Sequence, residues 1–326
     1  MSDFKAIILA GGSGERFWPL STPQRPKQFL RVFGGGSLIR QSVDRLRGLV
    51  RPADVFVVTS KALVAATRRE LPEVPKANVI GEPMRRDTGA AIALGTAAAG
   101  GGVLGFFPSD QLVADAGRFR RALSAAVAKA RRTGAMVTIG IKPQYPSTSF
   151  GYIDPKSGRF VEKPRERRAK EYLAKGYLWN AGMFIAKAEV FMAAFAAHAP
   201  ELSPLCGLKR RQAGFRSLAA VYEKLPRISF DYAVMERLGR VAVVKGDFGW
   251  DDVGSYGAFD KYFPHDAHGN VREGPCTAVD AADNICVTRT VPISLLGVKN
   301  LVVVSTPDGV LVADKNRITE MKKLFR

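Results

Sequence analysis

The stretch that decides the fold is Ala6-Ile-Ile-Leu-Ala-Gly-Gly-Ser-Gly-Glu-Arg-Phe17, near the start of the chain. Its apolar run predicts a buried strand, and three glycines follow directly. Glycines at the end of a strand let backbone amides approach a bound anion without interference from Cβ atoms. Arg16 and Lys27 add positive charge after these glycines. The stretch therefore predicts a phosphate site; its glycines are Gly11, Gly12 and Gly14.

Two common phosphate loops do not fit this spacing. A Walker loop needs Gly, four residues and then Gly-Lys-Ser/Thr, which is missing here. A dinucleotide fingerprint needs Gly-x-Gly-x-x-Gly, but Gly12-Ser-Gly14-Glu-Arg is followed by Phe17. The acidic residue that would hold a ribose is also missing, because residues 32–36 read Val-Phe-Gly-Gly-Gly. The spacing argues against an NAD site.

Helical and strand-like patterns alternate from residue 4 to residue 263. Residues 54–58 predict a strand before a helix at 60–71, and residues 136–141 predict a strand after a helix at 119–132. Such alternation is typical of an α/β fold with helices on both faces of the sheet. We expect a Rossmann-like, doubly wound sheet that is mixed but mostly parallel.

The pattern changes after residue 263, where Pro264 and Gly269 interrupt it. Short β-like runs follow, separated by turn residues. These runs lie at residues 284–288, 293–296, 301–305 and 310–313. The sequence therefore predicts a large domain at 1–263 and a small C-terminal β-rich domain at 264–326.

The chain is strongly basic, with 49 Lys and Arg residues against 30 Asp and Glu residues and a net charge of +19. Nucleic acid is a common partner of basic proteins. Here the basic residues are scattered, without the glycine and aromatic interleaving or the zinc pattern of RNA-binding modules. We expect a solvated basic surface and no nucleic-acid partner.

Residues 88–109 carry no charge and are long enough to cross a bilayer. A run of three glycines at 100–102 interrupts them, so we predict a small-residue helix, a break and a strand at 103–107, with no membrane partner. Asp3 and the short apolar run at 6–10 do not match a signal peptide. We expect a cytoplasmic protein.

The opening stretch resembles the signature of the nucleoside-diphosphate-sugar pyrophosphorylases. Within that family, Phe17-Trp-Pro-Leu-Ser21 and Pro26-Lys-Gln-Phe-Leu30 look most like the mannose-1-phosphate guanylyltransferases. The resemblance implies that the glycine loop binds a nucleoside triphosphate, that Arg16 clamps its β- and γ-phosphates, and that Lys27 reaches the phosphoryl group under attack. From the glycines alone, a tight strand-to-helix turn with surface cations is the alternative.

Two acidic motifs resemble the metal site of this family. Pro108-Ser-Asp-Gln111 stands where the family carries Pro-Ala-Asp-His, and Asp247-Phe-Gly-Trp-Asp-Asp-Val-Gly254 resembles Phe-Gly-Trp-Ser-Asp-Val-Gly. The resemblance implies that Asp110 and Asp252 bind Mg²⁺ or another divalent cation, which suits hard oxygen ligands and phosphate substrates. For each aspartate alone, helix capping or turn formation is the alternative.

Further motifs resemble the sugar site of the family. They are Phe150-Gly-Tyr-Ile153, Phe160-Val-Glu-Lys-Pro164 and Trp179-Asn-Ala-Gly-Met-Phe184. The resemblance implies sugar-phosphate binding by Gly151, Glu162, Lys163 and Asn180. A strand followed by a charged turn is the alternative for the second motif. Residues 229–236 also match a family segment, for which we expect a structural role.

Base recognition is expected from residues 82–89, which read Glu-Pro-Met-Arg-Arg-Asp-Thr-Gly, and from the main chain of Leu9 and Ala10. The family reads Arg-Asn-Thr-Ala where this chain has Arg86-Asp87-Thr88-Gly89. An ionised Asp87 could accept hydrogen bonds from guanine N1 and N2, whereas capping of the next helix is the equal alternative. The expected nucleotide contacts in this segment are Arg86, Asp87 and Gly89.

Together these motifs predict transfer of GMP from GTP to α-D-mannose 1-phosphate, giving GDP-mannose and pyrophosphate. The attacking sugar phosphate is already an anion, so alignment and charge neutralisation suffice. By the resemblance, residues 1–263 form the catalytic domain, and residues 264–326 form a β-helix-like domain that often helps dimerisation, so a homodimer is one expectation. The alternatives are a sister enzyme using glucose 1-phosphate with another nucleotide, and a non-catalytic nucleotide- or RNA-binding protein.

Overall fold

The computed structural model describes residues 3–12, 14–208 and 215–325 of the chain. The chain forms two compact units. The first unit comprises residues 1–11, 40–109 and 113–250, and the second comprises residues 12–39, 110–112 and 251–326. Each unit is therefore built from separate pieces of sequence, and the domain boundary expected after residue 263 stays a prediction.

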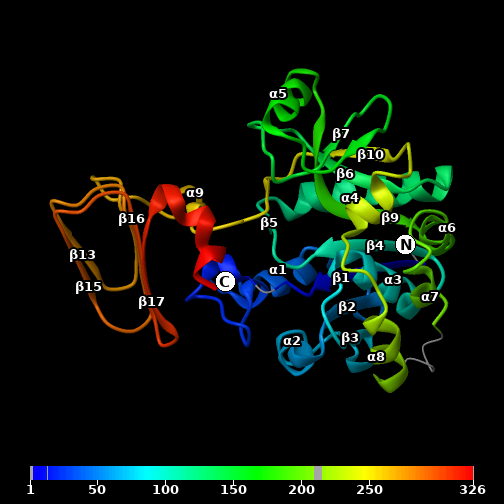
Figure 1. Ribbon diagram of the computed structural model, residues 1–326, viewed down its shortest axis with the longest axis horizontal. Helices are drawn as coiled ribbons and strands as arrows, with labels where there is room; N and C mark the ends of the chain where they lie inside the picture. The colour runs from blue at the N-terminus through cyan, green and yellow to red at the C-terminus, as the bar shows by residue number, and fades with distance from the viewer. Residues whose placement is uncertain (1–2, 13, 209–214, 326) are drawn as a thin grey trace. The chain divides into compact units, whose positions relative to one another are not determined.

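The first unit is built on a mixed sheet, whose main path among the described residues runs β10-β6-β9-β4-β1-β2-β3 (Figure 1). Strands β4, β1, β2 and β3 are parallel, as are β6 and β10, whereas β9 is antiparallel to both β4 and β6. The short strands β7 and β8 extend from β9. The bounds are β1 Phe4–Ala10, β2 Val55–Ser60, β3 Val79–Glu82, β4 Val103–Pro108, β6 Val137–Ile141, β7 Tyr152–Ile153, β8 Phe160–Val161, β9 Leu178–Lys187 and β10 Ala242–Gly246.

Helices cover both faces of this sheet, as strand β4 shows. Phe106 packs edge-on against Phe191, with ring centroids 4.9 Å apart, whereas Phe107 lies 6.2 Å from the ring of Phe119. Successive side chains of a strand point to opposite faces, so α6 (Ala188–His198) and α4 (Ala116–Thr133) cover different faces. The predicted doubly wound arrangement is therefore present.

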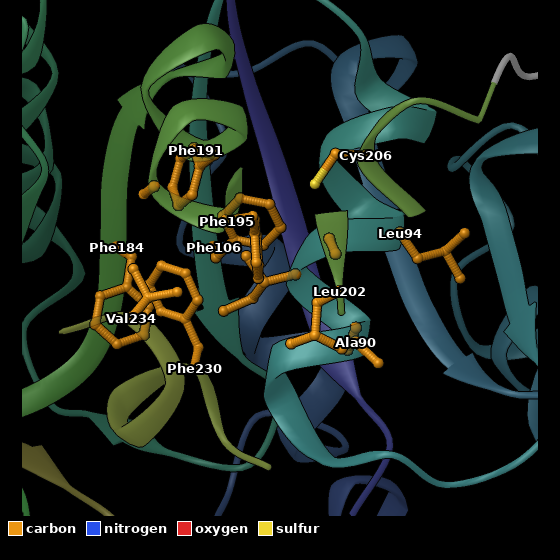
Figure 2. Close-up of a cluster of buried hydrophobic side chains, with 14 of the residues drawn as sticks. Ala90, Leu94, Phe106, Phe184, Phe191, Phe195, Leu202, Cys206, Phe230 and Val234 are labelled. Carbon is orange, nitrogen blue, oxygen red and sulfur yellow. The ribbon is translucent and has the colours of Figure 1, made fainter. Parts of the chain in front are cut away.

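An extensive hydrophobic core of the first unit lies on the α6 side of the sheet (Figure 2). It includes the small-residue helix α3 (Asp87–Ala99), where a Cβ on Gly95 would lie 2.8 Å from the ring of Phe106. A glycine here lets the helix approach the sheet closely, and the small-residue helix and the strand expected within residues 88–109 are both present. In the described part of the chain, no helix has the length and apolar character needed to cross a membrane.

The remaining helices and short strands vary in length. Their bounds are α1 Leu38–Asp44, α2 Val64–Glu70, α5 Glu166–Ala174, α7 Ser203–Cys206, α8 Phe215–Glu223, α9 Gly257–Tyr262, β5 Leu112–Val113 and β11 Trp250–Asp251. One π-helical turn, Asp231–Met235, follows α8 in the sequence.

The C-terminal part of the second unit is β-rich, as predicted. The strands β12, β14 and β16 pair in parallel in one sheet, and β13 pairs in parallel with β15 in another, so the chain alternates between the two sheets (Figure 1). This alternation is typical of a β-helix. The edge strand β17 is antiparallel to β16. The bounds are β12 Val271–Glu273, β13 Cys276–Val279, β14 Ile285–Thr288, β15 Ile293–Leu296, β16 Leu301–Thr306 and β17 Gly309–Asp314.

Two buried asparagines connect successive turns of this β-rich part. Asn284 Nδ2 donates to Asn270 Oδ1 at 2.9 Å and to the carbonyl oxygen of Val298 at 3.1 Å. Asn270 Nδ2 donates to the carbonyl oxygen of Ala281, and Asn284 Oδ1 accepts from the amide of Leu301. These side chains satisfy backbone groups at the corners between strands.

Candidate active site

The glycine loop is fixed against Lys27 within the second unit. Gly14 has φ +68°, a left-handed conformation, and a Cβ at this position would lie 2.4 Å from the backbone nitrogen of Lys27. Only glycine fits this contact without displacing the backbone. Gly14 is therefore required by the path of the chain around Lys27.

Lys27 is a buried cation that joins two of the predicted acidic motifs. Its Nζ donates to Asp110 Oδ2 at 2.9 Å and to the backbone oxygen of Asp252 at 2.7 Å. The side chain is 6% exposed, so the ammonium is largely withdrawn from water. Burial of a charge is costly unless it is paired and hydrogen-bonded, and both conditions are met here.

Arg16 and Asp252 meet beside Gly254. A Cβ on Gly254 would lie 3.3 Å from Arg16 Nη1 and 3.5 Å from Asp252 Oδ2, so the missing side chain makes room for both groups. The structure thus brings together, within the second unit, all four residues predicted to act on the phosphates: Arg16, Lys27, Asp110 and Asp252.

The charges in this group act on Asp252. Burial raises the pKa of Asp252, and the Asp110 carboxylate raises it further, while Lys27 and Arg16 act to lower it. Two neighbouring carboxylates that repel one another are a suitable donor set for a divalent cation. The described residues contain no group of three or more His, Cys, Asp or Glu that could hold a metal ion.

The four predicted sugar-site residues also lie together, within the first unit. Strand β7 pairs with both β8 and β9, and the amide of Asn180 donates to the carbonyl oxygen of Gly151 at 2.8 Å. A Cβ on Gly151 would lie 2.6 Å from Glu162 Oε2, so glycine makes room for that carboxylate. Lys163 Nζ lies 2.7 Å from Glu162 Oε1.

The predicted base-binding segment is more dispersed. Arg86 donates to the carbonyl oxygens of Tyr222 and Glu223, at 2.7 and 3.0 Å, and thereby holds the end of α8. A Cβ on Gly89 would lie 2.7 Å from the carbonyl oxygen of Ile228, which gives this glycine a packing role. The roles predicted for these two residues at the nucleotide stay predictions.

Asp87 is exposed at the first position of α3, with φ +66°. Its Oδ1 accepts from the amide of Thr88 at 2.8 Å, whereas Thr88 Oγ1 accepts from the amide of Phe230. Leu9 and Ala10 end strand β1, where their carbonyl oxygens accept from the Ser109 amide and the Thr59 hydroxyl. Each of these groups therefore already has a local structural contact.

Sequence reasoning did not single out Glu82, which ends strand β3 beside Gly11. A Cβ on Gly11 would lie 3.4 Å from Glu82 Oε2, and Glu82 Oε1 accepts from the Tyr222 hydroxyl at 3.1 Å. Burial raises the pKa of Glu82 to about 7, and the Tyr222 hydrogen bond only partly offsets this. The available signal was its position at the carboxyl end of a parallel strand, where such sheets bind ligands.

The chain belongs to the nucleotidyl transferase family, whose family model matches residues 5–268. A second family model, described as a MannoseP isomerase/GMP-like beta-helix domain, matches residues 274–326. The protein is therefore an enzyme of the nucleotidyltransferase class, and the α/β fold with a small β-helix-like region predicted from the sequence is confirmed.

Similar proteins cover nearly the whole chain. The xanthan biosynthesis protein XanB of Xanthomonas campestris pv. campestris is 35% identical over 99% of this chain and 73% of its own length. A mannose-1-phosphate guanylyltransferase of Escherichia coli K12 is 33% identical over 98% of this chain and 72% of its own length. A crystal structure from Thermus thermophilus, described as a mannose-1-phosphate geranyltransferase, is 36% identical with a TM-score of 0.88, covering 99% of this chain and 98% of that one. The resemblance found in the sequence motifs is thus confirmed at full length.

Proposed function

We propose that this enzyme transfers GMP from GTP to α-D-mannose 1-phosphate and releases GDP-mannose and pyrophosphate. The observation that carries the proposal is the Lys27 ammonium, which is held by the Asp110 carboxylate and the Asp252 carbonyl in the same unit as Arg16. Transfer between phosphates depends on cations and metal-binding carboxylates held in place. The relatives named mannose-1-phosphate guanylyltransferase support the choice of base and sugar.

The proposed roles follow the charge of each group. Arg16 would neutralise the β- and γ-phosphates, Lys27 the phosphoryl group under attack, and Lys163 the sugar phosphate. The nucleophile is already an anion, so these side chains align and neutralise, and no general base is needed. Glu162 and Asn180 would hold the hydroxyl groups of the sugar.

A divalent cation such as Mg²⁺ would be held by Asp110 and Asp252. Mg²⁺ is commonly bound by one or two carboxylates, with substrate phosphates and water completing its shell. When bound, it would neutralise the charge that several phosphates bring together. The repulsion that Asp110 exerts on Asp252 supports this assignment, because a cation relieves it.

For the base, Glu82 joins Asp87 as a candidate. Guanine presents two adjacent N–H donors on one edge, which a carboxylate can accept together. Glu82 is buried at the end of β3 and adjoins Gly11, whereas Asp87 is exposed. Asp87→Ala and Glu82→Gln, each assayed with GTP, ATP and dTTP, distinguish the two candidates. The variant that loses its preference for GTP identifies the residue that recognises the base.

The deciding experiment is a matrix of nucleoside triphosphates and sugar 1-phosphates with Mg²⁺, with pyrophosphate as the readout. We expect the highest kcat/KM for GTP with mannose 1-phosphate. A higher value for glucose 1-phosphate with another nucleotide would overturn the proposal in favour of a sister enzyme. Salt-dependent RNA binding without pyrophosphate release would instead identify a binding protein.

Lys27→Gln tests directly whether the ammonium of Lys27 takes part in the reaction. Removing one preorganised charge at a developing negative centre costs about 10²- to 10³-fold in kcat. Lys245→Gln, at an exposed lysine of β10, is the control and should keep the wild-type rate.

The cytoplasmic location and the homodimer stay predictions.

A further inference from the structure

The amide of Asn180 is already committed to protein partners. Its Oδ1 accepts from the amide of Gly182 at 3.1 Å, and it also lies 2.9 Å from the hydroxyl of Thr138, whose single proton it shares with the carbonyl oxygen of Met183. A backbone amide is a fixed donor, so it sets the orientation of the side chain and leaves Nδ2 pointing at Asp231. Asn180 can therefore donate to a sugar hydroxyl, but its oxygen is largely occupied.

Asp231 receives that second bond, since its Oδ1 accepts from Asn180 Nδ2 at 2.9 Å. A carboxylate has about four lone-pair positions, so one such bond leaves capacity to accept more. Asp231 is half-buried as a whole residue, whereas most of its neighbours in the turn are fully buried. It is thus a hydrogen-bond acceptor next to the predicted sugar residue whose own acceptor is used.

The position of Asp231 is set by a π-helical turn, Asp231–Met235. Phe230 and Val234 anchor this turn in the core beside Phe184 (Figure 2), with the rings of Phe184 and Phe230 5.0 Å apart. Single π-helical turns are rare and occur frequently at functional sites. The packing of Phe230 and Val234 therefore fixes the backbone from which the Asp231 side chain extends.

The surroundings of Asp231 suit a phosphorylated sugar. Lys163 pairs with Glu162, and its Nζ lies 6.0 Å from the ring centroid of Tyr232, the next residue of the π-helical turn. Burial and the neighbouring Glu162 carboxylate together raise the pKa of Asp231 to about 7, although Lys163 acts to lower it. A cation for a phosphate thus lies in the same cluster as two carboxylates that can accept from hydroxyl groups.

We propose that Asp231 is a sugar-recognition residue, whose carboxylate accepts a hydrogen bond from a ring hydroxyl of the hexose 1-phosphate while Asn180 donates to the same sugar. This replaces the structural role expected for residues 229–236, and it rests on the proposed function. Asp231, and not Asn180, is then the residue that accepts a hydrogen bond from the sugar hydroxyl.

Asp231→Asn is a sharp test because it preserves size and still offers an oxygen to Asn180 Nδ2. The other oxygen becomes an amino group, which cannot accept from a hydroxyl. If Asp231 only supports Asn180, sugar recognition survives this change. If Asp231 binds the sugar, kcat/KM for mannose 1-phosphate falls by about 10- to 100-fold while KM for GTP stays within about twofold.

The identity of the hydroxyl comes from the 2-, 3-, 4- and 6-deoxy analogues of mannose 1-phosphate. Wild-type enzyme should discriminate against the analogue that lacks the contacted hydroxyl, and Asp231→Asn should lose discrimination against that analogue alone. Unchanged penalties for all four analogues would overturn the proposal. Asp231→Glu, which retains the charge but moves the carboxylate, should also lose the discrimination and serves if the Asn variant folds poorly.

Glu189→Gln, at an exposed carboxylate in the first turn of α6, is the matched control and should behave as wild type. The two proposals fail differently. Wild-type enzyme that releases no pyrophosphate from GTP with any hexose 1-phosphate overturns the proposed function. If wild-type enzyme is active and both Asp231 variants discriminate against the deoxy analogues as wild type does, only the role of Asp231 is overturned.

Discussion

At the scale of single residues, Gly14 shows how the backbone constrains the chemistry. Gly14→Ala would place a Cβ against the Lys27 backbone in a left-handed conformation. The conformation alone costs about 1–2 kcal/mol, and the collision adds to it by displacing Lys27. We expect a lower melting temperature and a loss of pyrophosphate release of at least about tenfold.

Gly34→Ala separates conformational strain from collision. Gly34 has a similar φ of +72°, but a Cβ there would meet no atom within 4 Å. The melting temperature of Gly34→Ala should fall only by the amount that the strained left-handed conformation costs, which is similar in the two variants. Its kcat/KM should be unchanged. Equal activity losses in the two variants would show that the contact with Lys27 is irrelevant.

Glu82 makes a pH-dependent contribution to stability. Its pKa is about 7 in the folded protein against a reference value of 4.5, so the folded state binds a proton more tightly than the unfolded state. The free energy of unfolding should therefore fall as pH rises from about 4.5 to 7, by roughly 1–3 kcal/mol, and then level off. Urea unfolding of wild type and Glu82→Gln at several pH values measures this, since the variant lacks that fall. A constant difference between the two proteins across the range would contradict the assignment.

Motifs that resemble those of a known family predicted most of the candidate site, and some of these residues directly follow a strand. Asp110 follows β4 and Lys163 follows β8, so the distance of each residue from an apolar run can be counted in the sequence. Asp231 could not be assigned in this way, and the position of Glu82 at the end of β3 did not by itself single it out. Their importance comes from burial and from partners distant in sequence, Tyr222 and Asn180, which only the fold brings near.

At the scale of elements, the β-rich region shows which strands a sequence reveals. Strands β14 to β17 were predicted because they are rich in β-branched and other apolar residues. Strand β12 has only three residues, two of them charged, and β13 carries only one large aliphatic side chain, so both were missed. Asn270, Asn284 and Asn300 each precede a strand, at intervals that differ by two residues, so the repeat was not recognised. The long antiparallel strand β9 was also missed, because the motif at 179–184 was interpreted only through its resemblance.

Asn284→Ala tests the asparagine contacts between strands. It removes bonds to Asn270 and Val298 and leaves the amide of Leu301 without its partner. Buried unsatisfied groups are expensive, so we expect a loss of about 2–4 kcal/mol in the free energy of unfolding. Asn300→Ala is the control, because Asn300 Nδ2 donates to the exposed Asp314. We expect this variant to lose about 1 kcal/mol in the free energy of unfolding, because alanine is strained at the φ of +57° found there. Similar losses would argue against the buried contacts as the cause.

At the scale of the whole molecule, the second unit joins distant parts of the chain in one core. Phe17, Leu20 and Leu30 belong to the same hydrophobic cluster as Val302 and Val304 of β16. The Tyr256 hydroxyl also donates to the carbonyl oxygen of Phe17 at 2.9 Å. Alternation of patterns along the sequence could not predict this unit, because it combines residues 12–39 with residues 251–326.

Paired substitutions in neighbouring strands test this shared core. Val302→Ala with Val304→Ala removes methyl groups from side chains with no exposed surface, so a loss of about 1–3 kcal/mol per site is expected. Val310→Ala with Val312→Ala, at sites 61% and 65% exposed on β17, should have little effect. Pyrophosphate release should disappear at the temperature where the first variant melts. Activity that survives unfolding of the β-rich strands would contradict the dependence of Arg16 and Lys27 on that core.

The shared core also bears on biosynthesis at the ribosome. The loop with Arg16 and Lys27 emerges early, but the cluster that encloses its apolar neighbours includes Ile318 and Met321. Domains generally fold as units during translation. Arg16 and Lys27, the residues proposed to neutralise the phosphates, are therefore expected to reach their final arrangement only after synthesis has passed residue 321. A nascent chain stalled before that point would carry the loop in an inactive form.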